Sequence, residues 1–375
     1  MFFPSIVARR LRKRAAATTV KWRGLRLVAL LIGALSMVVG LYTGLLRLGV
    51  PLPSGARPNA DFHGAFMISG FLGTVISLER VVALGRPWAY LGPLLSSLAA
   101  LALVAGAPRF SALGFALAGG MMVIASASIA ARQLALFSLV LTIGMACWTV
   151  GSLQWLLSGF SPAVTGWWID FLVFTVSAER LELSRMRDLP RSSQIVFVGA
   201  PLLLLLGSVR NEFAVSWAPL TAAGLFCCAA WLLRYDIALQ TIQLTGLPRF
   251  SAIAILIGHG WLGIAGVLLM LAPTGITAFF YDAVVHAITI GFVLSMIFAH
   301  APIILPAVIG TRVRFSPASY APLILLYISL VLRIAADFLE SADLRVASGL
   351  ITIIALAAYA VILLLSTMRP SYLIL

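Results

Sequence analysis

The chain is dominated by apolar stretches of about 20 residues, and these limit its fold more than any other feature. A helix of about this length crosses the roughly 30 Å hydrocarbon core of a bilayer. Hydrophobic residues make up 62% of the chain, charged residues only 10%, and the mean hydropathy is +1.07. A soluble domain carries about 25% charged residues. The sequence therefore predicts an all-α polytopic membrane protein.

About twelve helices are expected to cross the membrane. They form a single integral membrane domain over residues 25–366, between a basic tail at 1–24 and a short tail at 367–375. The predicted spans are Leu25–Val50, Phe62–Leu84, Leu91–Ala107, Ser111–Ala130, Leu134–Leu157, Ala163–Val176, Ser193–Val209, Phe213–Leu233, Ser251–Leu271, Phe279–Ala299, Tyr320–Ala336 and Val346–Leu365.

The positions of the basic residues predict how these helices are oriented. If the N-terminal tail is cytoplasmic, 20 of the 26 basic residues face the cytoplasm, as the positive-inside rule requires. They are Arg9, Arg10, Arg12, Lys13, Arg14, Lys21, Arg23, Arg26, Arg80, Arg86, Arg132, Arg180, Arg185, Arg187, Arg191, Arg234, Arg249, Arg312, Arg314 and Arg369. Both termini are then cytoplasmic. The net charge of +14 is explained by topology and by contact with anionic lipid, and we expect no nucleic-acid partner.

Three segments of the chain resemble one another. GFLGTVISLER ends at Arg80, and DFLVFTVSAER ends 100 residues later at Arg180, with shared Phe, Leu, Ser, Glu and Arg positions. A third segment, GFVLSMIFAHA, places His300 opposite Glu79 and Glu179. We therefore expect three blocks of four helices, with the second, sixth and tenth helices around one axis. Chance similarity between apolar sequences is the alternative.

The chain has only four histidines, and two of them flank the segment HAITIGFVLSMIFAH. His286 and His300 share one helix face but lie roughly 21 Å apart along the axis, so they cannot bind one metal ion. His63 lies near the depth of His286, and His259 lies close to the middle of the membrane. Three histidines are thus expected in the middle and outer membrane, and His300 stands apart.

Neutral imidazole is a ligand for both haem iron and copper. His63 and His286 suit opposite sides of a b-type haem, and His259 could complete a neighbouring metal position. His300 is expected to be structural or proton-linked first and a metal ligand second. The alternative for all four is hydrogen bonding within the bundle or a proton path. The chain has no CxxCH motif for covalent haem attachment.

Two carboxylates add to this pattern. Asp282 lies one turn before His286 and could orient its ring, while Asp170 lies inside the sixth helix, where it needs a proton or a cation. The alternatives are an interfacial position for Asp282 and a hydrogen bond between helices for Asp170. We expect Glu79–Arg80 and Glu179–Arg180 to form salt bridges where their helices leave the membrane.

Three histidine-containing segments carry a resemblance to a known family. DFHGAFMISGF, IGHGWLGIAG and DAVVHAITIGF resemble, in the same order, three histidine-containing segments of NnrS proteins. The resemblance implies a twelve-helix protein of the bacterial inner membrane that holds haem and copper and is associated with nitric oxide metabolism in denitrifying bacteria. This chain has one histidine where NnrS proteins have two in the second helix, so the resemblance implies haem more strongly than copper.

Three classes of function follow from the sequence. The first is a membrane haem protein that handles nitric oxide or another diatomic gas, with enzymatic turnover left open. The second is a secondary transporter with a proton-linked site of buried aspartate and histidine. The third is an assembly partner of a respiratory complex that needs no cofactor. The resemblance favours the first.

Overall fold

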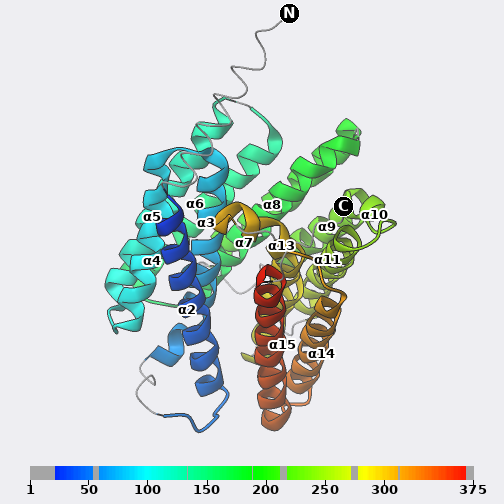
Figure 1. The fold of residues 1–375 in the computed structure, drawn as a ribbon. Helices are drawn as coiled ribbons and strands as arrows, with labels where there is room; N and C mark the ends of the chain where they lie inside the picture. The colour runs from blue at the N-terminus through cyan, green and yellow to red at the C-terminus, as the bar shows by residue number, and fades with distance from the viewer. Residues whose placement is uncertain are drawn as a thin grey trace, which may run out of the picture.

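A computed structural model describes residues 22–53, 59–132, 134–187, 189–211, 218–271, 278–310 and 313–368. All elements in this part of the chain are helical, and eleven helices are long and apolar enough to cross a membrane. The helix α7 (Pro162–Ser184) is of similar length but carries Asp170, Glu179, Arg180 and Glu182. Together with α7 the helices reach the expected twelve, so the chain is an all-α multi-pass membrane protein (Figure 1).

The bounds of the helices agree with the predicted spans to within a few residues, except at the end of α7 and of α13. The elements are α2 (Arg23–Arg47), η2 (Ala65–Gly73), α3 (Thr74–Leu84), η3 (Pro87–Tyr90), α4 (Leu91–Val104), α5 (Pro108–Ala130), α6 (Leu136–Ser158), α7, η4 (Arg185–Arg187), α8 (Arg191–Asn211), α9 (Ala218–Tyr235), α10 (Ala238–Thr241), α11 (Leu247–Leu271), α12 (Ala278–His286), η5 (Ala287–Leu294), α13 (Ser295–Ile309), η6 (Pro317–Ser319), α14 (Tyr320–Phe338) and α15 (Ala342–Met368). Most of both predicted tails, the start of the predicted span Phe213–Leu233 and Arg312 lie outside the described residues.

The helices gather in two groups, with α7 and α8 between them (Figure 1). In the first group α4, α5 and α6 pack in sequence order, and α2 packs on η2 and α4. In the second group α11 packs on α9 and η5, and α14 packs on α15. The groups are joined where α7 meets η5 and α9, and where α13 and α15 contact α2.

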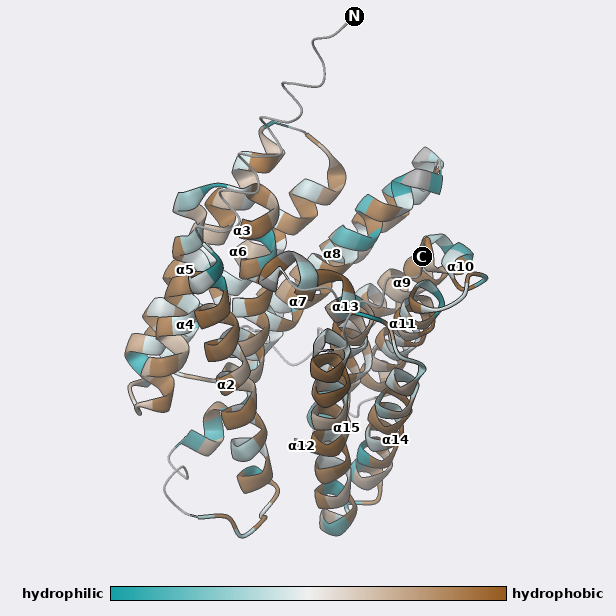
Figure 2. Cartoon of the chain, in the orientation of Figure 1, coloured by the Kyte–Doolittle hydropathy of each residue, from teal (hydrophilic) through white to brown (hydrophobic). Residues whose placement is uncertain are grey.

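The distribution of side chains is that of a membrane protein, with large apolar residues outside and polar residues inside. Leu31, Phe110 and Leu364 are each more than 60% exposed, and hydrophobic residues cover the helices along most of their length (Figure 2). In contrast, many serines and threonines are buried, together with Asp170, Arg180 and other charged residues. In lipid, close packing of small residues and polar contacts hold helices together.

The three helical segments that carry the repeat are in mutual contact. Arg80 of α3 forms an ion pair with Glu179 of α7, and the next residue, Arg180, contacts His300 of α13. The third contact between these segments is that of α13 with α3. The second, sixth and tenth spans therefore surround one axis, with their aligned polar positions joined in a chain.

The structure corrects two expectations about where helices end. α7 does not leave the bundle near Val176 but continues to Ser184, so Glu179 and Arg180 lie inside the helix. Their pairing with groups on neighbouring helices explains why the chain can stay helical there. Likewise, the tenth span does not end at Ala299, because α13 continues past Pro302 to Ile309.

Candidate functional site

His63 and His286 lie beside each other, although they are far apart in the sequence. Their ring centroids are 6.4 Å apart and the ring planes differ by 20°. The pair joins the start of the second span to the first third of the tenth. About 14% of the His286 side chain is exposed, so the pair is not sealed inside the protein. The structure thus brings together the two histidines that the sequence analysis assigns to opposite sides of one metal.

Each histidine is followed by a π-helical segment. His63 precedes η2 by two residues, and His286 is the last residue before η5. A π-helix adds a residue to each turn and is often found at functional sites, because it redirects side chains. In η2, the carbonyl of Phe66 accepts a hydrogen bond from the Ser36 hydroxyl, and that of Ser69 accepts one from the Ser96 hydroxyl.

The two imidazoles are held in the same tautomer. Nδ1 of His63 lies 2.6 Å from the carbonyl oxygen of Gly40, and Nδ1 of His286 lies 2.9 Å from that of Asp282. A carbonyl oxygen only accepts, so each Nδ1 carries the hydrogen and donates it. Each Nε2 is left with a free lone pair, which is the form in which neutral histidine binds a metal.

An ion pair holds the backbone beside His286. The guanidinium of Arg333 on α14 donates two hydrogen bonds to the carboxylate of Asp282, with Nε–Oδ2 and Nη2–Oδ1 distances of 2.7 and 3.0 Å. The Oδ1 atom of Asp282 is also 3.4 Å from Nδ1 of His286. The expected role of Asp282 as a partner of the ring is therefore filled mainly by its carbonyl oxygen, while its carboxylate fixes α12 against α14.

The ring of His63 lies against the backbone of α2. A Cβ atom at Gly44 would lie 2.9 Å from both Cε1 and Nδ1 of His63, closer than real contacts allow. Glycine at this position therefore gives the imidazole the space that it occupies. The same helix supplies the Gly40 carbonyl that accepts the hydrogen bond from His63. One face of α2 thus fixes both the position and the tautomer of the ring.

His259 lies away from this pair, although the sequence analysis groups it with them. It is fully buried on α11, with Nε2 3.6 Å from Oδ2 of Asp236, and neither ring nitrogen has a hydrogen-bond partner in the described part of the chain. Its ring also packs on Phe292, at a centroid distance of 6.0 Å. Asp236 follows the end of α9, and this places His259 in a buried charged cluster rather than beside the pair of His63 and His286.

This charged cluster, Arg180–Asp236–His259–His300, connects four spans. Arg180 donates to both carboxylate oxygens of Asp236 at 2.7 and 2.8 Å, and its Nη1 is 3.3 Å from Nε2 of His300. Nδ1 of His300 lies 2.8 Å from the carbonyl oxygen of Met296 and must donate to it. Both nitrogens of His300 are therefore used within the protein, which agrees with a structural role and leaves no free lone pair for a metal.

Asp170 is buried on α7 at the side of the bundle that faces α8. Ser208 hydrogen-bonds its carboxyl group, but Oδ2 has no partner within the described residues.

The cysteines do not form a metal site with Asp170. Cys147 and Cys228 are buried, and Cys228 contacts the hydroxyl of Ser177 at 3.2 Å. In the described ranges, no group of three or more His, Cys, Asp or Glu side chains is arranged to hold a metal ion.

Comparison with known proteins identifies the family of the chain but not its activity. Residues 26–368 match a family described as a domain of unknown function (DUF8744). The chain belongs to the DUF8744 family. The match covers nearly all of α2 and every later span, and so includes both members of the histidine pair. No curated protein and no solved structure matches the chain.

In this DUF8744 protein, sequence reasoning missed several residues that build the site. Arg333 was not predicted because a single arginine inside a predicted helix carries no motif, and Asp236 was not predicted because it follows a predicted span. Gly44 was also missed, since the sequence does not show which glycine faces a histidine. The π-helical segments leave only a weak signal, namely a small residue shortly after each histidine.

Proposed function

We propose that this DUF8744 protein is an integral membrane haem protein in which His63 and His286 bind the iron from opposite sides. The observation that supports this proposal most is the distance between the rings. Metal–imidazole bonds are about 2.0–2.1 Å long and a ring nitrogen lies about 1.1 Å from its centroid, so two imidazoles whose nitrogens face one ion from opposite sides have centroids roughly 6.3 Å apart. The centroids here are 6.4 Å apart.

The set of donors fits haem better than a bare metal ion. A structural zinc site is closed by four protein ligands, and catalytic zinc sites keep three. The pair offers two imidazole nitrogens, and no group of three or more ligating side chains occurs in the described residues. Haem brings four nitrogens of its own and needs only axial ligands from the protein. Copper has less support, because His259 faces Asp236 and His300 binds Arg180.

The chain's own residues hold both imidazoles in the form that can bind a metal. The carbonyls of Gly40 and Asp282 keep both Nε2 atoms unprotonated, and Arg333 fixes the segment that carries His286. When bound, haem supplies a one-electron couple, and where only one of the two histidines stays on the iron, the other leaves a position for a diatomic gas. The three histidine segments resemble NnrS proteins, which favours nitric oxide as the gas and the bacterial inner membrane as the location, with both termini in the cytoplasm.

An optical spectrum of the detergent-purified protein, oxidised and dithionite-reduced, tests this proposal, with a pyridine haemochrome assay for haem type. We expect a b-type spectrum that is lost or changed to a high-spin form in His63→Ala and in His286→Ala. His259→Ala and His300→Ala are matched controls and should keep the wild-type spectrum. Nitric oxide is then added to the reduced protein, and a shift of the haem absorption bands supports gas binding.

Two results would contradict the proposal. A colourless protein from haem-replete cells, correctly folded by its thermal transition, excludes bound haem. A haem spectrum that survives both His63→Ala and His286→Ala, but disappears in His259→Ala, assigns the iron to the buried charged cluster instead.

A secondary transporter is the second candidate, and one observation favours it. The Arg180–Asp236–His259–His300 cluster places buried charges at the junction of four spans, which is where transporters bind ions. This candidate predicts a colourless protein that moves protons when reconstituted in vesicles. A pH-sensitive dye trapped inside such vesicles measures that movement, with Asp236→Asn as the inactive control.

A further inference from the structure

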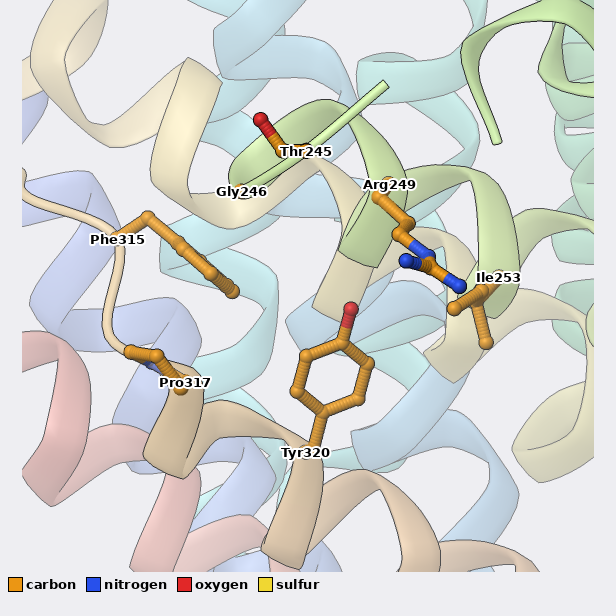
Figure 3. Close-up of a pocket in the computed structure, with 7 residues that line it drawn as sticks. All are labelled: Thr245, Gly246, Arg249, Ile253, Phe315, Pro317 and Tyr320. Atoms are coloured by element: carbon orange, nitrogen blue, oxygen red, sulfur yellow. The ribbon is translucent and has the colours of Figure 1, made fainter. Parts of the chain in front are cut away.

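A cavity of about 470 Å³ lies at the end of the bundle opposite the start of α12, remote from the histidine pair. It is formed where α11 begins and where the chain enters α14 (Figure 3). The cavity is lined by Thr245, Gly246, Arg249, Ile253, Phe315, Pro317 and Tyr320. Three of these residues bear polar side-chain atoms and three are apolar, so the cavity suits an amphipathic ligand.

The polar side of the cavity carries uncompensated positive charge. Arg249 is exposed, and no acidic side chain pairs with it within the described residues. Pro248 has no N–H, and the first amide to bond within α11 is that of Phe250, to the carbonyl of Gly246. The beginning of this 25-residue helix therefore adds its partial positive charge to that of Arg249.

The floor of the cavity is formed by the rings of Phe315 and Tyr320, which pack on the buried ring of Phe250. The buried ring of Phe250 lies 5.4 Å from that of Phe315 and 5.1 Å from that of Tyr320, centroid to centroid. The rings of Phe315 and Tyr320 are themselves 6.3 Å apart. In Figure 3 the Tyr320 hydroxyl points up between Phe315 and Arg249. The floor is thus formed without a ligand, and it directs one hydroxyl donor toward the charged side.

Two apolar stripes run from this cavity toward the middle of the membrane. On α11 the stripe continues from Ile253 to Ile257, which is 40% exposed. On α14 it continues from Tyr320 to Ile324 and Ile328, which are 55% and 50% exposed. Residues four apart share one helix face, and a bond from the Tyr327 hydroxyl to the carbonyl of Ala254 holds the two helices together.

We propose that this cavity binds the phosphate headgroup of an anionic glycerophospholipid, with the acyl chains on the stripes of α11 and α14. Arg249, Thr245 and Tyr320 offer a cation and two hydroxyls to a phosphate diester at the level where both helices enter the membrane. This end also carries many arginines, among them Arg86, Arg132, Arg234 and Arg314. Arginines gather where a leaflet is anionic. A free phosphate ion shares the headgroup chemistry but makes no use of the stripes.

Native mass spectrometry of the whole protein tests this site. The protein is released from vesicles of phosphatidylcholine alone or of phosphatidylcholine with phosphatidylglycerol. We expect one retained phosphatidylglycerol and no retained phosphatidylcholine. Arg249→Gln should weaken this retention about tenfold, as the loss of one charge-assisted hydrogen bond implies. Arg249→Lys should keep part of it. Arg314→Gln is the matched control, because it removes an exposed arginine of the same segment outside the cavity.

Each other result would overturn the proposal. Equal losses in Arg249→Gln and Arg314→Gln mean that the lipid follows surface charge and not this cavity. Equal retention of phosphatidylcholine means that no anionic headgroup is recognised. Release of phosphatidylglycerol by millimolar inorganic phosphate means that the ligand is the free ion. The thermal transition of every variant is measured alongside, and these outcomes do not depend on whether the protein binds haem.

Discussion

The histidine pair is positioned by residues that carry no chemistry of their own. Gly44 gives the His63 ring its space, and the carbonyls of Gly40 and Asp282 choose the tautomer of both rings. Such positions are set by packing between helices. This is why the sequence could suggest the two histidines but could not show what holds them.

Replacing Gly44 with alanine tests the space around His63. The new methyl group would lie 2.9 Å from the ring, and such overpacking costs typically about 1–3 kcal/mol. We expect a lower thermal transition and, if haem is bound, partial loss of the low-spin spectrum. Gly120→Ala on α5 is the control, since its Cβ meets nothing within 4 Å. Both changes gain the same helix propensity, so equal transitions in the two variants contradict the steric argument.

A second change at the scale of single residues concerns the Asp282–Arg333 ion pair. Arg333→Gln removes two charge-assisted hydrogen bonds from a carboxylate that is mostly covered, and we expect a loss of about 1.5–3 kcal/mol. Asp282→Asn together with Arg333→Gln leaves no unpaired charge and should recover part of the loss. Thermal unfolding of the two single variants and the double variant gives the coupling energy directly. A coupling energy near zero would show that the pair does not hold α12 against α14.

Among the helices, the sequence predicted existence and order well but not local irregularity. Long apolar runs have few competing structures, so each of the twelve predicted spans has a helix. In contrast, the helix end predicted near Val176 was wrong, because α7 continues to Ser184. Glu179 and Arg180 lie inside this helix and form the expected salt bridges, with Arg80 and Asp236. The π-helical segments η2 and η5 were missed because no residue type requires them.

Breaking the Arg180–Asp236 pair should destabilise the packing of α7 against α9. The side chain of Arg180 is 3% exposed and that of Asp236 is fully buried, so Asp236→Asn leaves a buried guanidinium without its counter-charge. Loss of one partner of a buried ion pair costs about 3–5 kcal/mol. The measurement is thermal unfolding in detergent, with the exposed Asp343→Asn as control. If both variants unfold at the same temperature, the pair is not a structural link.

For the whole molecule, the internal repeat predicted how helices far apart in the sequence are arranged. Three thinly similar segments suggested helices around one axis, and the structure joins those helices through Arg80–Glu179 and Arg180–His300. The two π-helical segments add a likeness between the second and tenth spans that identities alone did not show. The sixth span has no histidine near its start and no π-helix, so the pair forms between only two of the three repeats.

The direction of the whole bundle in the membrane is the last prediction. Gln243 lies in the segment before α11, at the arginine-rich end, and Asp343 lies in the first turn of α15, at the other end; both are exposed. The amide of Arg314, in the segment before α14, donates a hydrogen bond to the carbonyl of Ser366 near the end of α15. The start of α15, which carries Asp343, therefore lies at the end of the bundle opposite to that segment and to Gln243. In a chain whose three cysteines are replaced, a membrane-impermeant maleimide should label Asp343→Cys in intact cells. Gln243→Cys should react only after lysis, and the reverse pattern would show that the arginine-rich end faces outward, against the positive-inside rule.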